Sequence, residues 1–530
     1  MPKYKAFKLP SLLGFLFLFV IQVTQANESA PVALNNESLK LQFNLLSGTV
    51  QHWQLPGIQD TSGRAQDMAA PQGQLFALRG EIAGKDLQQW QELAGGWKIL
   101  EQQPDVLILE LSSTNQPFSI KKTWRLSKQS WRVDFDLDLD FQGKTLTQAD
   151  HLELEVGPGI GEVPTHGLGM GQSIYSYTEL AFHDANGVNT LRLNNETELA
   201  NRSSNRLQGW TWVGLQSRYL ALILTPSNDR AQRSQWRAYI PDLPKEKKEH
   251  AAFESTLKVL LPVSDNSGEP FQHYSWSVFG GGKAYSALTA TQPDLGGLLF
   301  SGLWDWMRAL CLAIMHVLQF IQQIIGSWGL AIIVLAVMVR IAVYPVAKKA
   351  ILAQKKFALI QARIQPELKE IRRNYKGGEQ SERILQLYES HQVSPLAGLK
   401  PLLIVLIQVP IFVALYHLLG QTFELRDASF LWIKSLAEPD QLFPLGIDLP
   451  LLGSYFNLLP VLMSLTTLLS IKLAPAPDSD ASSTTRQSIT TGLMGVGFFL
   501  LFYSFPSGMV LYWTFANILQ VAHQKLAKVG

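Results

Sequence analysis

Hydrophobic positions divide the chain into two parts with different patterns. From about residue 30 to 290, short apolar runs alternate with polar positions and are separated by Gly, Asn, Asp and Pro, whereas after residue 298 the apolar stretches are long and almost free of charge. Alternation with a period of two is typical of strands with one buried face, and about 20 consecutive apolar residues can cross a bilayer as a helix. The pattern predicts a β-domain followed by membrane-embedded helices.

The clearest strand is Trp131–Phe141, in which five apolar residues alternate with Arg132 and four aspartates. A calcium site is the alternative for these aspartates, but they lack the loop spacing of a calcium-binding hand, so we interpret them as a solvated sheet face. Similar short runs between turn residues predict an all-β sandwich. These runs are Val106–Leu111, Trp210–Leu224 and Phe253–Val263.

Two further stretches of the β-domain invite chemical interpretations. Gly157–Gly171 is rich in glycine but lacks the Gly-Lys-Ser/Thr of a phosphate loop, so we expect an ordinary loop. His151, Glu153 and Glu155 alternate, which favours a strand over a metal site. The single cysteine, Cys311, excludes an internal disulfide framework, and a net charge of +2 does not indicate nucleic acid as a direct partner. No catalytic constellation is evident.

The first 26 residues have the pattern of a secretory signal. Lys3, Lys5 and Lys8 precede the apolar run Leu12–Val23, and Ala26 follows shortly afterwards. The run is shorter than a typical span, which favours cleavage, and a retained membrane anchor is the other interpretation. Under both, the β-domain is exported.

Five later stretches are apolar and long enough to span: Ser327–Val346, Leu399–Leu419, Ser454–Leu473, Ile489–Phe505 and Ser507–Val521. Residues 347–400 carry eleven Lys and Arg against five Glu, whereas residues 420–450 carry two basic residues against five acids. Because Lys and Arg mark cytoplasmic loops, the first of these segments is predicted inside and the second outside.

This orientation decides the role of a sixth apolar stretch, Leu298–Ile325. If it crossed the membrane, the basic 347–400 segment would lie on the wrong side. We therefore predict an amphipathic helix along the outer interface, with Trp304, Trp306 and Arg308 near its start. The predicted segments are 1–26, signal sequence or anchor; 27–294, exported β-domain; 295–326, interfacial helix; 327–346, 399–419, 454–473, 489–505 and 507–524, transmembrane; 347–398, cytoplasmic helical hairpin; 420–453, outer loop; 474–488, cytoplasmic linker; and 525–530, cytoplasmic tail.

The cytoplasmic segment is predicted as two helices, Lys348–Tyr375 and Gln380–His391, folded back at Gly377-Gly378. Apolar residues line one side of each helix. The basic surface suits two roles that the sequence does not separate, contact with anionic lipid headgroups and docking of protein partners.

Arg340 is the only charged residue between Arg308 and Lys348. A charge inside hydrocarbon costs about 3 kcal/mol or more. One interpretation is snorkelling, because the side chain lies roughly 9 Å from the cytoplasmic end of its span. The other is a polar cavity lined also by Gln408 and by Thr and Asn residues of later spans. Since the other predicted spans contain no acidic residue, such a cavity would be hydrated and able to receive acidic or polar segments of another protein.

Several separated motifs then resemble one family, the YidC membrane-protein insertases, over about residues 295–525. They are Trp328-Gly329, Arg340-Ile341-Ala342-Val343-Tyr344-Pro345, Ser394-Pro395-Leu396-Ala397-Gly398, Gln408-Val409-Pro410-Ile411-Phe412 and Phe505-Pro506-Ser507-Gly508. The large exported domain is similar to that of Gram-negative members. The resemblance implies a polytopic α-helical membrane core of five spans, an all-β supersandwich-like exported domain and a cytoplasmic helical hairpin.

The resemblance also implies a function without catalysis, cofactor or metal. Family members insert and help to fold membrane proteins, alone or with the Sec translocon, from a hydrophilic groove in the inner membrane, with the large domain in the periplasm and the C-terminus in the cytoplasm. It places Arg340, Gln408 and Trp513 in the groove and makes Phe412, Phe499, Phe502 and Phe505 part of the spans along which clients slide. Nascent membrane proteins, the ribosome, the signal recognition receptor and anionic lipids are the further partners, with a docking hairpin that carries Lys348, Lys349, Lys355, Lys356, Arg372 and Arg373. A solute or ion transporter and an envelope sensor with a ligand-binding exported domain are the alternatives; we find no repeats that would support a transporter.

Overall fold

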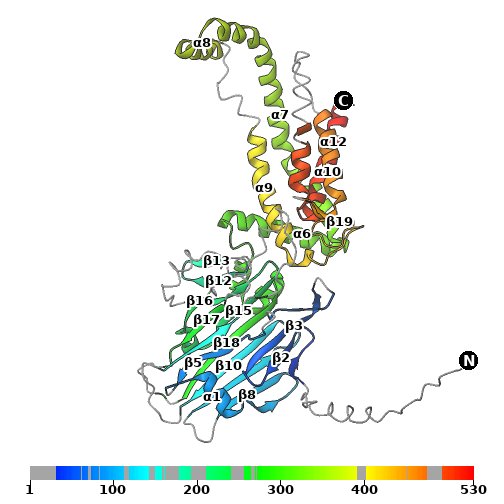
Figure 1. Cartoon of the computed structure of the whole chain (residues 1–530). Coiled ribbons are helices and arrows are strands. Elements are labelled where there is room, and N and C mark those ends of the chain that lie inside the picture. The colour runs from blue at the N-terminus through cyan, green and yellow to red at the C-terminus, as the bar shows by residue number, and fades with distance from the viewer. Residues whose placement is uncertain are drawn as a thin grey trace, which may run out of the picture.

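The computed structural model describes residues 31–529 apart from 61–62, 70–72, 83, 113–117, 142–149, 158–159, 161–177, 193–209, 240–255, 264–268, 270, 391–401, 450–451, 474–491 and 494. A β-domain lies at one end and a helical bundle at the other (Figure 1). The predicted signal or anchor, the linker 474–488 and most of Gly157–Gly171 lie outside the described residues.

Within the described residues, three antiparallel sheets build the β-domain. In spatial order, the four-stranded sheet contains β1 (Val32–Asn35), β2 (Lys40–Asn44), β3 (Thr49–Gln59) and β4 (Ala65–Asp67). The nine-stranded sheet contains β13 (Gly187–Arg192), β12 (Glu179–Asp184), β14 (Trp212–Gln216), β15 (Leu220–Pro226), β18 (Phe271–Gly282), β10 (Arg132–Asp140), β9 (Ser119–Leu126), β8 (Val106–Ser112) and β7 (Lys98–Gln102). The five-stranded sheet contains β16 (Gln235–Tyr239), β17 (Thr256–Leu261), β11 (His151–Val156), β5 (Ala77–Ile82) and β6 (Lys85–Asp86).

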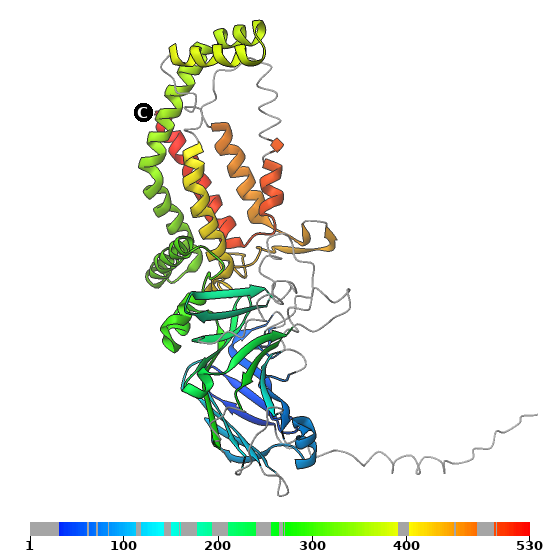
Figure 2. The same ribbon diagram turned by 90° about the vertical axis from the view of Figure 1, so that its left-hand side faces the viewer.

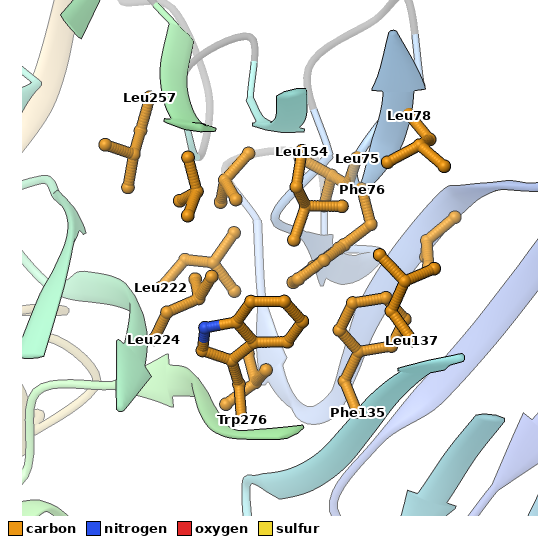
Figure 3. Packing of buried hydrophobic residues seen from close by; sticks show 14 of the residues in the cluster. Leu75, Phe76, Leu78, Phe135, Leu137, Leu154, Leu222, Leu224, Leu257 and Trp276 are labelled. Atoms are coloured by element: carbon orange, nitrogen blue, oxygen red, sulfur yellow. The ribbon is translucent and has the colours of Figure 1, made fainter. Parts of the chain in front are cut away.

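Apolar side chains from facing sheets meet in the core of this sandwich. Phe135, Leu222 and Trp276 of the nine-stranded sheet face Leu154 and Leu257 of the five-stranded sheet (Figure 3). All five side chains are buried. Burial of such residues is the main favourable contribution to folding, so the predicted β-sandwich is confirmed as a large β-rich domain with its own core. The short helices attached to it are α1 (Leu87–Ala94), α3 (Asp229–Gln232), α5 (Tyr285–Thr291) and the 3-10 helix η3 (Pro293–Leu298).

The acidic face of the predicted strand at 131–141 is cross-linked by ion pairs. The strand is confirmed as β10, and Asp136 pairs with Arg125 and accepts a hydrogen bond from Ser275 at 2.6 Å. Asp138 contacts His273 at 2.6 Å. The face that we expected to be solvated is therefore polar, but its aspartates pair with side chains of neighbouring strands.

The strand β11 likewise uses its acids for pairing. Glu153 pairs with Arg237 and lies 3.5 Å from Lys258, whereas Glu155 lies 2.7 Å from the same lysine. The prediction that His151, Glu153 and Glu155 lie on a strand is confirmed.

The single run predicted over Trp210–Leu224 is two strands, β14 and β15, joined by a tight turn in which Ser217 N–H donates to the carbonyl of Leu220 at 2.9 Å. The strand β15 shows no alternation because both of its faces are covered. Leu222 lies in the sandwich core, and Ile223 belongs to a second core shared with the helices. A strand buried on both faces reads as a continuous apolar run, which concealed the turn.

The bundle consists of α7 (Trp328–Asn374), α9 (Leu402–Gln421), α10 (Leu458–Leu473), a helical stretch at residues 495–502 and α12 (Ser507–Val529). Two described helices are long and apolar enough to cross a membrane, α6 (Asp305–Ile325) and the first part of α7, Trp328–Pro345; a shorter apolar helix covers Leu458–Ile471. The remaining described elements are α8 (Gly377–Ser390), the 3-10 helix η5 (Phe423–Leu425), β19 (Phe443–Leu449) and β20 (Gly453–Phe456).

The helix α6 lies across the end of the bundle that adjoins the β-domain (Figures 1 and 2). It buries one stripe, Met307, Cys311, Met315 and Leu318, and exposes Trp304, Trp306 and Phe320. Positions four apart lie on one face of a helix, so α6 is amphipathic in its packing.

The predicted span 327–346 and the first predicted arm of the hairpin, Lys348–Tyr375, belong to one helix, α7. It continues without a break to Asn374, with Pro345 and Pro366 inside it, and α8 folds back on its far end. Ile364 and Leu387 form the centre of that contact, with Leu368, Ile371 and Tyr388 around it. The predicted boundary marked a change from apolar to basic composition, which is not a helix break.

Candidate functional site

Arg340 faces the interior of the bundle. It continues a stripe on α7 that begins with Ile332 and Ala336, both buried, at spacings of four residues. Its guanidinium donates a hydrogen bond to the side-chain carbonyl of Gln520 on α12. The side chain is partly buried, and its partner is a neutral amide, so the positive charge stays available to a further anion.

The helix α12 presents polar and aromatic residues on one face. Trp513, Asn517 and Gln520 follow each other at spacings of four and three residues, so they lie on one side of the helix. Asn517 donates to the hydroxyl of Thr467 on α10 at 2.7 Å. Thr467 in turn donates to the carbonyl of Met463, as Thr466 does. Polar side chains of two helices, α10 and α12, thus lie in the same half of the bundle as Arg340.

Aromatic residues of α9, the 495–502 helix and α12 form a cluster beside this polar group. The ring of Phe412 lies 5.4 Å from Trp513 and 6.0 Å from Phe502. Phe505 lies 4.9 Å from Phe502, whereas Phe499 packs separately on Tyr503 at 5.2 Å. Four predicted residues are brought together, namely Trp513, Phe412, Phe502 and Phe505.

The predicted site residues differ in exposure. Phe502 is only 1% exposed and lies inside the bundle rather than on a surface. Gln408, Phe412 and Trp513 are half-buried. Among the described side-chain contacts, none joins Arg340 to Gln408 or Trp513.

Burial changes along the bundle. Near the β-domain the helices pack tightly, and Ile332, Leu418, Met463 and Val510 are all buried. Toward the other end, none of residues 337–345 of α7 or 515–522 of α12 is buried, although they belong to the same helices. The bundle is therefore closed at the end next to the β-domain and loosely packed at the end that holds Arg340.

A segment predicted only as a charged loop closes the tight end. This junction loop, residues 422–440, fastens three helices. Its Asp440 accepts hydrogen bonds from the N–H groups of Leu458 and Leu459 at 2.8 and 3.1 Å and so caps α10. Carbonyls of the loop accept from Ser507 and Gly508 at the start of α12, both at 2.8 Å.

Glycines allow the loop to approach closely. A Cβ at Gly508 would lie 2.9 Å from the carbonyl oxygen of Leu436, and one at Gly329 would lie 2.1 Å from the ring of Phe430. The Trp-Gly and Pro-Ser-Gly motifs therefore have a packing role at this junction, which explains their residue types without reference to a ligand.

The β-domain holds the same loop through Arg218, in the turn between β14 and β15. Its guanidinium contacts the carboxylate of Glu438 at 2.6 Å and donates to the carbonyls of Gly420 at 2.8 Å and Ala437 at 2.7 Å. The hydroxyl of Tyr219 also donates to Glu438, and burial holds the pKa of Tyr219 well above its ordinary value, so the hydroxyl keeps its proton. These contacts connect the β-domain to the ends of the bundle helices that lie nearest to it.

The hairpin formed by α7 and α8 carries the remaining predicted residues. Lys348, Arg372 and Arg373 are exposed on it. Lys349, Lys355 and Lys356 lie on α7, and their side chains are outside the described part of the structure.

Together these features define an integral membrane protein with a helical core, an attached β-domain and a basic helical hairpin at opposite ends of that core. Residues 320–529 match the family described as 60Kd inner membrane protein. Over this region the chain is similar to the YidC membrane protein insertases.

The membrane protein insertase YidC of a Janthinobacterium species is 33% identical over 226 residues, which are 42% of this chain and 37% of that protein. The namesake of Chlorobaculum parvum is 23% identical over 418 residues, 77% of this chain and 65% of that protein. The matches thus cover about a third to two thirds of the relatives' own length. A crystal structure of an active YidC insertase with its first transmembrane domain resolved aligns over 93% of both chains at 16% identity, with a TM-score of 0.35.

Proposed function

We propose that this chain inserts other proteins into the inner membrane and assists their folding. The observation that carries the proposal is the uneven packing of the bundle around Arg340. A bundle closed at one end and loose at the other offers a polar recess inside the membrane, with Arg340, Asn517, Gln520 and Gln408 on its walls. Such a recess shortens the hydrocarbon path that a polar flank of a client must cross.

The driving force is the client's own apolar segment. Moving that segment from water into lipid releases about 25 cal/mol per Å² of apolar surface, so no nucleotide, metal or catalytic residue is needed. The half-buried rings of Phe412 and Trp513 border the recess and offer a sliding surface for the segment as it passes into lipid. Phe502 supports them from inside the bundle.

The orientation of the chain follows from its charges. We assign five spans to the first part of α7, α9, α10, the helix around 495–502 and α12. The basic hairpin lies in the cytoplasm and the β-domain in the periplasm, because Lys and Arg are retained on the cytoplasmic side. The helix α6 then lies along the outer interface, where its exposed tryptophans are favoured. The C-terminus is cytoplasmic.

The partners follow from the same arrangement. Nascent membrane proteins are the clients, the basic hairpin is placed to meet anionic lipids, the ribosome or the signal recognition receptor, and the Sec translocon is the expected companion for larger clients. A transporter or a sensor is not favoured, because the relatives that cover most of the membrane core are membrane protein insertases.

The decisive experiment is complementation. In cells depleted of their own insertase, expression of this chain should restore membrane insertion of a short Sec-independent client, followed by protease protection. The proposal fails if insertion stays absent while immunoblots show the chain in the inner membrane at the normal level.

Replacing Arg340 by alanine should reduce insertion of a client with an acidic exported segment by about fivefold and that of a neutral client much less. A single pair of charges in a hydrated recess is worth about 1 kcal/mol, which sets this magnitude. Insertion is measured for both clients in parallel. Gln520→Leu is the matched control, because it removes the amide partner but keeps the charge, and it should preserve the preference. An equal loss for both clients in Arg340→Ala would contradict an electrostatic role.

A further inference from the structure

The β-hairpin formed by β19 and β20 is unusual in having apolar side chains without protein around them. Its two strands pair only with each other, and the hairpin projects from the side of the bundle at the end next to the β-domain (Figures 1 and 2). The exposed fractions are 48% at Phe443, 62% at Ile447 and 41% at Tyr455. In water, a two-stranded hairpin with such a surface would be marginally stable.

The base of the hairpin is fixed rigidly at one level of the bundle. The side-chain carbonyl of Asn457 accepts from the N–H of Gln441 at 2.9 Å, and its amide donates to the carbonyl of Tyr503 at 2.7 Å. The hydroxyl of Tyr503 donates to the carbonyl of Tyr455 at 3.0 Å. Both strands are therefore held at the outer end of α10, which begins at Leu458, one residue after Asn457.

That level coincides with the boundary of the apolar helices. α10 is apolar from its first turn, so its start marks where the hydrocarbon region begins. The helix α6, with exposed tryptophans at its N-cap (Trp304) and in its first turn (Trp306), lies at the same end of the bundle (Figure 1). Within residues 442–456 only Asp448 carries a charge. Aromatic and apolar residues with few charges are the composition that the membrane interface selects.

We propose that the β19–β20 hairpin lies in the outer interface of the lipid bilayer, with Phe443, Ile447 and Tyr455 in contact with lipid. Its continuity with α10 places it at the membrane surface, and its low charge favours lipid over a polar protein partner. The hairpin and α6 then contact the outer interface on different sides of the bundle and fix the position of the bundle along the membrane normal. The proposal depends on the membrane location of the chain and not on insertion activity.

The test uses the full chain in vesicles of phosphatidylethanolamine and phosphatidylglycerol. An environment-sensitive nitrobenzoxadiazole label is attached at Ile447→Cys in a Cys311→Ala background. The matched control is Leu100→Cys, on β7, where the native side chain is 50% exposed on the β-domain. Lipids with a spin label near the headgroup should remove most of the emission at residue 447, which should also be blue-shifted, and leave that at residue 100 unchanged.

Two results would overturn the proposal. Equal emission and equal quenching by aqueous iodide at both positions would place the hairpin in water. A label at residue 447 that is shielded from both lipid and aqueous quenchers would show that a protein, a second copy or another membrane protein, covers it. Thermal unfolding at the same temperature as the unlabelled chain establishes that both labelled chains are folded.

Discussion

Replacing Arg218 by alanine is expected to destabilise the full chain by about 3 kcal/mol and to loosen the junction loop from the β-domain. Removing one partner of a buried ion pair costs about 3–5 kcal/mol, and the lower end applies because the Glu438 side chain remains 31% exposed. Two backbone carbonyls, of Gly420 and Ala437, also lose their donor. Thermal unfolding in detergent micelles and amide hydrogen exchange across residues 422–440 measure the two effects.

The matched control is Arg237→Ala, which removes another arginine–glutamate pair of the β-domain. Arg237 is 48% exposed at the surface of the five-stranded sheet, and exposed pairs contribute about 1 kcal/mol or less. Arg218→Lys should not restore the wild-type behaviour, because an ammonium group lacks the planar fork that serves three acceptors at once. If Arg237→Ala destabilises the chain as much as Arg218→Ala, the junction has no special role.

The stability of the β-domain is expected to rise with pH because of Lys122. This side chain of β9 is fully buried; its ammonium donates to the carbonyls of Gly48 at 2.7 Å and Phe76 at 2.8 Å and lies 4.6 Å from the centre of the Trp97 ring. Burial, and to a lesser extent the charge of Arg79, lowers the pKa of Lys122 from 10.5 to about 7.

The sign follows from proton binding. Below about pH 7 the folded and unfolded chains both hold the proton, and the cost of the buried charge is fully present. Between about pH 7 and 10.5 the unfolded chain binds more protons, so the free energy of unfolding increases by up to about 1.4 kcal/mol per pH unit.

Urea unfolding of the full chain in micelles, followed by tryptophan fluorescence between pH 7.5 and 9, measures this slope. Lys122→Met should lower the slope of the unfolding free energy against pH by an amount that corresponds to nearly one bound proton. Lys121→Met, on the opposite face of the same strand, should leave it unchanged. Identical slopes in the wild type and in Lys122→Met would mean that Lys122 does not lose its proton in this range.

Periodicity predicted those parts of the fold in which one face is buried and the other is not. The alternation around Phe135 located β10, and the apolar sides of the two arms located the hairpin contact between Ile364 and Leu387. It did not separate β15 from β14, because a strand covered on both faces does not alternate between apolar and polar positions. The boundary at residue 346 rests on composition alone, and the helix α7 continues through it.

Of the candidate site, the sequence predicted Arg340 but not the contacts of Gln520, Glu438 and Asp440. Arg340 is recognisable from the sequence because a charge in an apolar span is rare, whereas its partner Gln520 is a neutral amide that no charge pattern indicates. Glu438 and Asp440 were counted only as charges that orient the chain. Glu438 binds Arg218, which lies more than 200 residues away in the sequence. Asp440 caps α10 from within an irregular loop. Neither leaves a periodic signal.

The unbroken course of α7 sets a minimum length for an arriving chain. Arg340 and the first hairpin contact, Ile364, stand on the same helix, and 24 helical residues rise about 36 Å. An extended polypeptide covers about 3.3 Å per residue, so a segment held at the hairpin needs roughly eleven residues to reach Arg340. Under the proposed function, a client segment shorter than this distance could contact only one of the two positions at a time.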